Sequence, residues 1–183
     1  MALTRINNQA LPTLDHDKLP SGTVLQTVTV TTDSTASITS DSGGNQITQL
    51  NTLITPKSTS SKLLITVSIC GEFSSYSQNY NTMFSISRTI SGSHTELTAS
   101  GSNNRIHGIM PPAINHHGDA GSTLESVYFQ YVDSPSTTSQ ITYAPRVKSQ
   151  TSNTFYLNRT VTDTDSAPYE RGMSSVVIQE IAG

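Results

Sequence analysis

Charged side chains are scarce in this sequence of 183 residues, where Lys, Arg, Asp and Glu together make up 13%. An average soluble domain contains about 25%. The formal net charge is −3, and the 10 Lys and Arg residues are scattered along the chain. A basic patch of the kind that binds a nucleic-acid backbone is therefore missing, and we expect no nucleic acid among the partners.

Cysteine and long apolar runs are also scarce. Cys70 is the only cysteine, which excludes an internal disulfide and a zinc site built from thiolates. It follows Ile69 in an alternating segment, so we expect a small buried hydrophobic residue. No run approaches the ~18 apolar residues of a membrane span, and Met1 to Gly22 lacks the apolar middle of a secretory signal. The sequence predicts no membrane partner and folding in a cytoplasm.

Serine and threonine take the place of charge. The chain contains 28 Ser and 27 Thr, against 40 Leu, Ile, Val and Phe residues. That apolar share is just above the ~20% that marks disordered chains, and the length suits one domain. We expect a folded protein with a thin core and a hydroxyl-rich surface.

After Gly22, apolar and polar residues alternate with a period of two, which is typical of strands with one buried face. The aligned apolar sets include Leu63, Ile65, Val67 and Ile69; Val24, Val28 and Val30; Phe84, Ile86 and Ile90; and Val127, Phe129 and Tyr131. The pattern predicts strands over residues 24–32, 46–55, 63–70, 83–90, 125–132, 140–147, 154–158 and 174–181. This indicates an all-β, jelly-roll-like β-sandwich of about eight strands.

The first 22 residues show neither the period of two that is typical of strands nor the period of 3.6 that is typical of helices. Pro12, Pro20 and Gly22 interrupt them. We interpret residues 1–22 as an extended N-terminal arm that anchors on another chain, and residues 23–183 as the sandwich domain. The apolar residues would enter grooves, the prolines would limit the entropy lost on docking, and polar residues would bind exposed backbone. The anchoring residues in this hypothesis are Arg5, Ile6, Asn7, Leu11, Pro12, Leu14, Leu19 and Pro20.

No catalytic or metal-binding pattern is present. The histidines (His16, His94, His107, His116 and His117) lack metal-ligand spacing. Asp163, Asp165 and Glu170 offer oxygen ligands for calcium, but the loop lacks the usual glycine, so a solvated turn is favoured over a calcium site. Glu72, Glu96, Glu125 and Asp133 are too scattered to nominate a glycosidase pair, and no Gly-x-Ser-x-Gly elbow occurs. We expect no enzyme activity, metal or cofactor.

Seven tyrosines favour a binding role, because tyrosine combines an apolar ring with a polar tip. The segment 74–81 has the Tyr, Ser and Asn composition of binding loops, although a plain polar hairpin loop also fits it. Residues 99–122 form the longest stretch without a predicted strand. We take Tyr76, Tyr80, His116 and His117 as a candidate outer binding loop, with a host surface glycan as its partner.

Four segments carry a family resemblance: LPSGTVLQ at 19–26, ITPKSTSSKLLI at 54–65, FQYVDSPSTTS at 129–139 and IQEIAG at 178–183. In order and spacing they resemble small virion surface proteins of tailed phages, many of them cyanophage-like, which are described as capsid-decorating or tail-fibre-like. The resemblance spans nearly the whole chain.

The resemblance implies a homotrimer on the virion surface, made in the host cytoplasm and anchored by its N-terminal arm to the major capsid protein or another virion protein. Because the arm leads directly into one domain, we favour a capsid decoration (cement) protein that stabilises the shell. A tail fibre or receptor-binding protein is the alternative.

Overall fold

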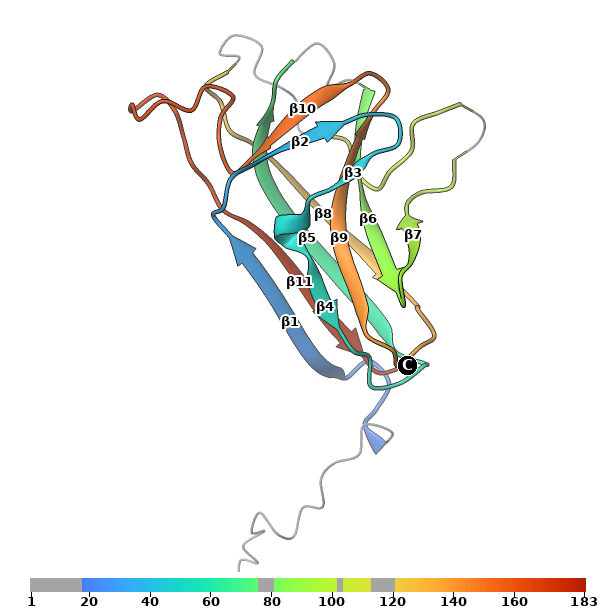
Figure 1. Cartoon of the computed structure of the whole chain (residues 1–183). Coiled ribbons are helices and arrows are strands. Elements are labelled where there is room, and N and C mark those ends of the chain that lie inside the picture. Colours follow the sequence, from blue (N-terminus) through green and yellow to red (C-terminus); the bar gives the residue numbers. More distant parts are fainter. Residues whose placement is uncertain (1–17, 76–80, 102–103, 113–120) are drawn as a thin grey trace, which may run out of the picture.

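Two antiparallel sheets pack face to face around the core (Figure 1). The structure is a computed structural model that describes residues 18–75, 81–101, 104–112 and 121–183. The larger sheet contains β1 (Val24–Thr32), β2 (Ala36–Ser40), β5 (Lys62–Phe73), β8 (Glu125–Asp133), β10 (Asn153–Leu157) and β11 (Ser174–Ile181). The smaller sheet contains β3 (Asn45–Gln46), β4 (Thr52–Ile54), β6 (Thr82–Ile90), β7 (Ser93–Leu97) and β9 (Ile141–Ser149). The predicted all-β sandwich is confirmed.

The strand pairing is nested along the chain. β1 pairs with β11, β3 and β4 pair with β9, β5 pairs with β8, and β6 pairs with β7. This is the pairing of one long antiparallel ribbon rolled into two sheets, which is the jelly-roll arrangement. β2 and β10 form an added pair, which joins the larger sheet where β10 meets the end of β5.

The predicted period-two pattern places the core. Leu63, Ile65, Val67 and Ile69 of β5 are at most 1% exposed. Phe129 of β8 is also buried, and Tyr131 packs against the same cluster. At the far end of β5, the rings of Phe73, Phe84 and Phe155 meet at centroid distances of 4.9 to 6.2 Å. These contacts hold the two sheets together along the whole length of β5.

The structure differs from the predicted strands at three places. β2 and β7 were not expected, because their sequences are largely polar and only one residue in each is a buried hydrophobic. The predicted strand at 46–55 is two short strands separated by a 3-10 turn at Thr48–Leu50. The turn lets both Ile47 and Leu50 reach the core, where each is 0% exposed.

Two side chains differ from their expected positions. Val24 is 49% exposed, because the β1–β11 register shifts between Val24 and Gln26 and breaks its alignment with Val28. Cys70 is only partly buried, since it lies on the outer face of β5. Its Sγ atom is 3.4 Å from both the Asn158 Oδ1 and the Met173 carbonyl oxygen. Burial raises the pKa of the Cys70 thiol.

Gly71 is required where β10 crosses the end of β5. A Cβ there would lie 2.2 Å from the Tyr156 carbonyl oxygen and 2.5 Å from the Phe155 ring. We expect Gly71→Ala to lower the free energy of unfolding by about 1–3 kcal/mol, because neither neighbour can move freely. Gly43→Ala, in an exposed turn at ordinary φ, is the control and should change stability by less than about 0.5 kcal/mol. Equal melting temperatures for the two variants would contradict this reading of the β5–β10 contact.

Candidate binding surfaces

Different segments of the chain extend from the two ends of the sandwich (Figure 1). The anchor end is where residues 18–23 and the C-terminal residues 181–183 meet, beside the start of β5 at Lys62. The loop end is bounded by Ser75, Asn81, Pro112 and Gly121. β5 connects the two ends, and its 12 residues span about 40 Å. The arm and the candidate outer loops therefore join opposite ends of the molecule.

Backbone hydrogen bonds fasten the base of the arm to β11. The Gly22 N–H donates to the Ala182 carbonyl oxygen at 2.8 Å, and the Ala182 N–H donates to Thr23 at 2.8 Å. The Thr23 hydroxyl donates to the Pro20 carbonyl oxygen at 2.7 Å. Gly22 has φ +89°, a left-handed conformation that glycine adopts without strain. The chain thus leaves the sandwich from a fixed point.

A buried carboxylate stabilises the anchor end. Glu180 is 0% exposed and faces inward from β11. It accepts a hydrogen bond from Gln26 Nε2 at 2.5 Å and from the Lys57 N–H at 2.6 Å. One side chain thereby joins β1, β11 and the segment before β5.

A second carboxylate joins the two sheets near the same end. Asp133 of β8 accepts two hydrogen bonds from Arg88 Nη1 of β6, at 2.8 and 3.0 Å, and one from the Tyr143 hydroxyl of β9 at 2.6 Å. Asp133 is 6% exposed and Tyr143 is 0% exposed. Burial, followed by the hydrogen bond and negative charge of Asp133, raises the pKa of Tyr143 well above 10.0.

Tyr143→Phe gives a pH-dependent test of this network. We expect a loss of about 1–2 kcal/mol at neutral pH, since one hydrogen bond to a charged group is removed. Tyr143 binds its proton more tightly in the folded state, so its contribution is complete below pH 10 and falls as pH rises further. The stability difference between wild type and variant should therefore narrow above pH 10. A stability difference between wild type and variant that stays constant above pH 10 would argue against a buried Tyr143–Asp133 hydrogen bond.

The loop end has a buried carboxylate of its own. Glu72 is 3% exposed and accepts hydrogen bonds from the Gly121 N–H at 2.6 Å and the Val161 N–H at 2.7 Å. Asn158, with φ +57°, donates to the Thr32 and Ser34 carbonyl oxygens at 2.9 and 3.0 Å. These bonds fix two loops of the larger sheet against each other.

Asp163, Asp165 and Glu170, which were weighed as calcium ligands, lie in a segment of turns and bends between β10 and β11. Asp163 pairs with Arg171 at 2.5 Å and lies 3.9 Å from Arg159, whereas Asp165 and Glu170 are exposed. Within the described ranges, no group of three or more His, Cys, Asp or Glu residues is placed to hold a metal ion. The segment is a turn with ion pairs.

Two adjoining grooves open at the loop end beside β6. The first, about 350 Å³, is lined by Asn81, Asn104, Arg105 and Gln150 together with Met83. The second, about 260 Å³, shares Met83 and Arg105 and extends toward Gly108. Amides and a guanidinium beside a short apolar stretch offer several hydrogen bonds to a polar ligand.

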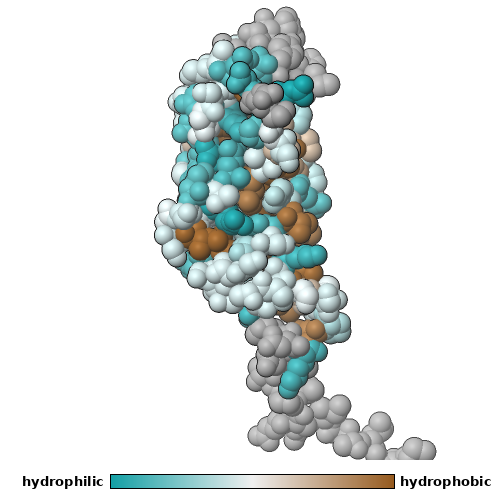
Figure 2. All heavy atoms as spheres, turned by 90° about the vertical axis from the view of Figure 1, so that its right-hand side faces the viewer, coloured by the Kyte–Doolittle hydropathy of each residue, from teal (hydrophilic) through white to brown (hydrophobic). Residues whose placement is uncertain are grey.

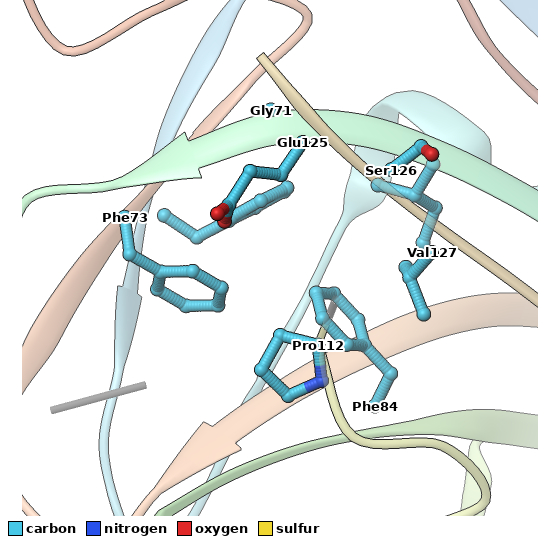
Figure 3. Close-up of a pocket in the computed structure, with 9 residues that line it drawn as sticks. Gly71, Phe73, Phe84, Pro112, Glu125, Ser126 and Val127 are labelled. Carbon is cyan, nitrogen blue, oxygen red and sulfur yellow. The ribbon is translucent and has the colours of Figure 1, made fainter. Parts of the chain in front are cut away.

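A much smaller space lies beside Pro112 (Figure 3). Phe73, Phe84 and Pro112 face it, and Glu125 extends over it from β8. Its free volume is about 10 Å³, which is close to the space that one water molecule occupies. It is a packing contact at the end of the core and not a ligand site.

The outer face of the smaller sheet carries paired charges. Glu96 of β7 lies 3.0 Å from Lys148 Nζ of β9 and accepts the Ser85 hydroxyl at 2.6 Å. Burial alone would raise the pKa of Glu96, but these hydrogen bonds and the charges of Lys148 and Arg146 lower it. Arg146 Nη1 also lies 2.6 Å from His94 Nε2. The side view across β7 is mostly hydrophilic, with hydrophobic residues in small separate groups (Figure 2).

Most of the predicted site residues lie outside the described ranges. These are Arg5, Ile6, Asn7, Leu11, Pro12 and Leu14 of the arm, and Tyr76, Tyr80, His116 and His117 of the outer loop. Leu19 is half-buried and Pro20 is exposed, both at the anchor end. In the part of the chain that is described, no helix has the length and apolar character to cross a membrane.

Comparisons with known proteins add little to this picture. No family model matches the chain, and no curated protein matches it. Among solved structures, a chain of infectious bursal disease virus, Gx strain, is similar at 14% identity with a TM-score of 0.34, over 85% of this chain and 39% of that one. This chain thus spans well under half the length of that protein. The fold assignment rests on the strand pairing described above.

Proposed function

We propose that this chain is a structural protein on the virion surface of a tailed phage. In this proposal it is a homotrimeric capsid decoration (cement) protein, made in the host cytoplasm, which binds the major capsid protein through residues 1–22 and stabilises the shell. The observation that carries it is the division of the molecule into opposite ends, with the arm leaving from a fixed anchor end. Jelly rolls are common among capsid proteins, although a fold alone does not set function.

The mechanism follows from the reach of the arm. An extended chain covers about 3.3–3.6 Å per residue, so the 17 residues that precede the fixed base could reach roughly 58 Å and cross between neighbouring shell subunits. Three arms on one trimer bind at high effective concentration after the first has docked. Weak contacts of each arm then suffice for lasting attachment.

The hydrogen bonds at the anchor end suit a protein that is attached through its N-terminal arm. Glu180 joins β1, β11 and the segment before β5, and Asp133 joins the two sheets near the same end, so force on the arm is passed to the whole sandwich. Glu72, Asp133 and Glu180 are each buried in hydrogen bonds to their neighbours. Because these carboxylates are occupied by structural hydrogen bonds, their arrangement supports our proposal that the protein has no catalytic role.

Shell stability tests the function directly. Virus particles that lack this protein should release their DNA at a lower temperature than complete particles, and adding the purified protein back should restore the higher temperature. Particles that are equally stable with and without the protein would contradict the cement role.

A receptor-binding role at a tail tip is the second candidate, and the grooves beside β6 favour it. In that case the loop end would bind a host surface glycan, with Asn81, Asn104, Arg105 and Gln150 supplying hydrogen bonds. The purified protein should then bind host cells, and Arg105→Ala should weaken binding about tenfold by removing one charged hydrogen bond. Failure of the wild-type protein to bind cells at high concentration would exclude this candidate.

A further inference from the structure

The two grooves beside β6 gather polar side chains that have no partner in the protein. Four exposed side chains that line them make no hydrogen bond or ion pair within the described part of the chain: Asn81, Asn104, Arg105 and Gln150. Amides that hold the sandwich together instead donate to other segments, as Gln26, Gln46 and Asn158 do. The four side chains around the grooves are therefore available to a ligand.

Arg105 differs from the other arginines that the structure describes. Each of the others binds a carboxylate or backbone carbonyl oxygens: Arg88, Arg146, Arg159 and Arg171. Arg105 is exposed, and no Asp or Glu occurs among the described residues that line either groove. The positive charge of Arg105 is thus uncompensated at the groove wall, which favours an anionic group in the ligand.

Backbone hydrogen bonds hold both walls of the grooves. On one side, the Gln150 N–H donates to the Asn81 carbonyl oxygen at 3.0 Å. On the other, Phe84 and Met110 exchange backbone hydrogen bonds at 2.7 and 3.2 Å. A Cβ on Gly108 would lie 2.7 Å from the Phe84 carbonyl oxygen, so this segment packs directly on β6. Walls that are held in place lower the entropy lost when a ligand binds.

The residues of the walls narrow the class of anion. A planar guanidinium matches a carboxylate through two parallel hydrogen bonds. Side-chain amides both donate and accept, as the hydroxyls of a sugar do. Met83 and Ile106 are partly buried and add a short apolar strip for the C–H face of a sugar ring. A nucleic-acid backbone needs several cations, whereas the described lining residues include one arginine and no lysine.

We infer that these grooves bind a saccharide that carries a carboxylate, such as a uronic acid unit of an acidic polysaccharide. Arg105 holds the carboxylate, and the amides bind hydroxyls of the same sugar ring and the next one. The first groove, about 350 Å³, falls within the ~300–1,000 Å³ of typical ligand pockets, and the second continues it. Adjoining sugar units therefore occupy adjoining grooves.

This inference rests on the receptor-binding candidate for the function and names its ligand class. It does not depend on attachment to a shell. The grooves lie at the loop end, opposite the arm, so a decoration protein also exposes them.

Matched oligosaccharides test the inference. Hexamers of galacturonic, glucuronic and mannuronic acid are titrated into the full-length protein in a calorimeter, beside hexamers of galactose, glucose and mannose with the same linkages. The members of each pair differ only in the carboxylates. At least one acidic hexamer should bind at least about tenfold more tightly than its neutral counterpart at low salt, and added salt should reduce this preference.

Arg105→Gln should remove the preference, because glutamine keeps hydrogen-bond donors but loses the charge. The acidic hexamer should then bind about as weakly as the neutral one, with an unchanged melting temperature. Arg171→Gln is the matched control, since it removes an exposed arginine outside the grooves, and it should keep the preference. Gln150→Ala should weaken binding of both hexamers of a pair, and it locates the site if Arg105→Gln does not fold.

Three results would overturn the inference: no binding of any acidic hexamer, equal binding within every pair, or an undiminished preference in Arg105→Gln. Displacement of the hexamer by an equal concentration of inorganic sulfate would also overturn it, because the site would then bind an anion and not a sugar. Host-cell binding is scored separately. Cell binding without hexamer binding contradicts the ligand class alone, and hexamer binding without cell binding contradicts the receptor role alone.

Discussion

Removing residues 1–17 should abolish attachment to shells while leaving a folded protein. The variant begins at Lys18 and keeps every described hydrogen bond at the base of the arm, including those of Pro20, Gly22 and Thr23. Three docked arms supply the avidity, so their loss should lower apparent affinity for shells at least about 100-fold. Co-sedimentation of purified protein with shells that lack it measures the effect.

The control keeps the length and composition of the arm. A variant with the order of residues 1–17 scrambled should also fail to attach, because the prolines and leucines no longer match their grooves. Melting temperatures of both variants should equal that of the wild type. Attachment of the truncated protein at wild-type affinity would show that residues 1–17 are not the anchor.

Asp133→Ala should produce the largest loss of stability among single substitutions away from the apolar core. It leaves the partly buried Arg88 guanidinium and the fully buried Tyr143 hydroxyl without their shared acceptor. Because Asp133 and Tyr143 are buried and Arg88 is partly buried, we expect a loss of about 3 kcal/mol, at the lower end of the range for a broken buried ion pair. For a domain of this size the melting temperature should fall by roughly 10 °C.

Asp163→Ala is the matched control. It also removes a carboxylate paired with arginines, Arg159 and Arg171, but at an exposed turn. Exposed ion pairs contribute about 0–1 kcal/mol, so this variant should melt close to the wild type. If both variants melted at the same temperature, the Asp133 network would not be the link between the sheets that the structure indicates.

The strands were predictable wherever alternation was strong. β1 and β11 match the expected ranges of 24–32 and 174–181, and β5, β6 and β8 differ by a few residues at their ends. These strands bury one face, and burial imposes a period of two on the sequence. β2 and β7 lie at sheet edges and bury little, so their sequences carry no such signal.

The inward positions of the buried carboxylates were predictable from the alternation of apolar and polar residues, but their hydrogen-bond partners were not. Asp133 continues the inward series Val127, Phe129 and Tyr131, and Glu180 continues Val176 and Ile178. An acidic residue at an inward position predicts a buried acid, but its partners come from strands distant in the sequence. Arg88 and Gln26 could be assigned only after the register was known.

The binding surfaces were predictable only in outline. The sequence separates an irregular arm from the sandwich, and the structure places its base at one end and the flanks of the outer loops at the other. The pairing of Thr29, Val177, Thr66 and Gln130 across the larger sheet was not foreseen, because these residues come from four distant segments. Only the order of strands in the sheet brings them into one row.

Imaging of labelled virus particles tests the central claim most directly. Antibody fragments raised against residues 23–183 should bind particles, because the loop end faces outward when the arm is docked. Electron micrographs should then show the label distributed over the head, at regular positions on the shell. Label confined to the tail tip, or intact particles without label, would contradict an arm-anchored decoration of the capsid.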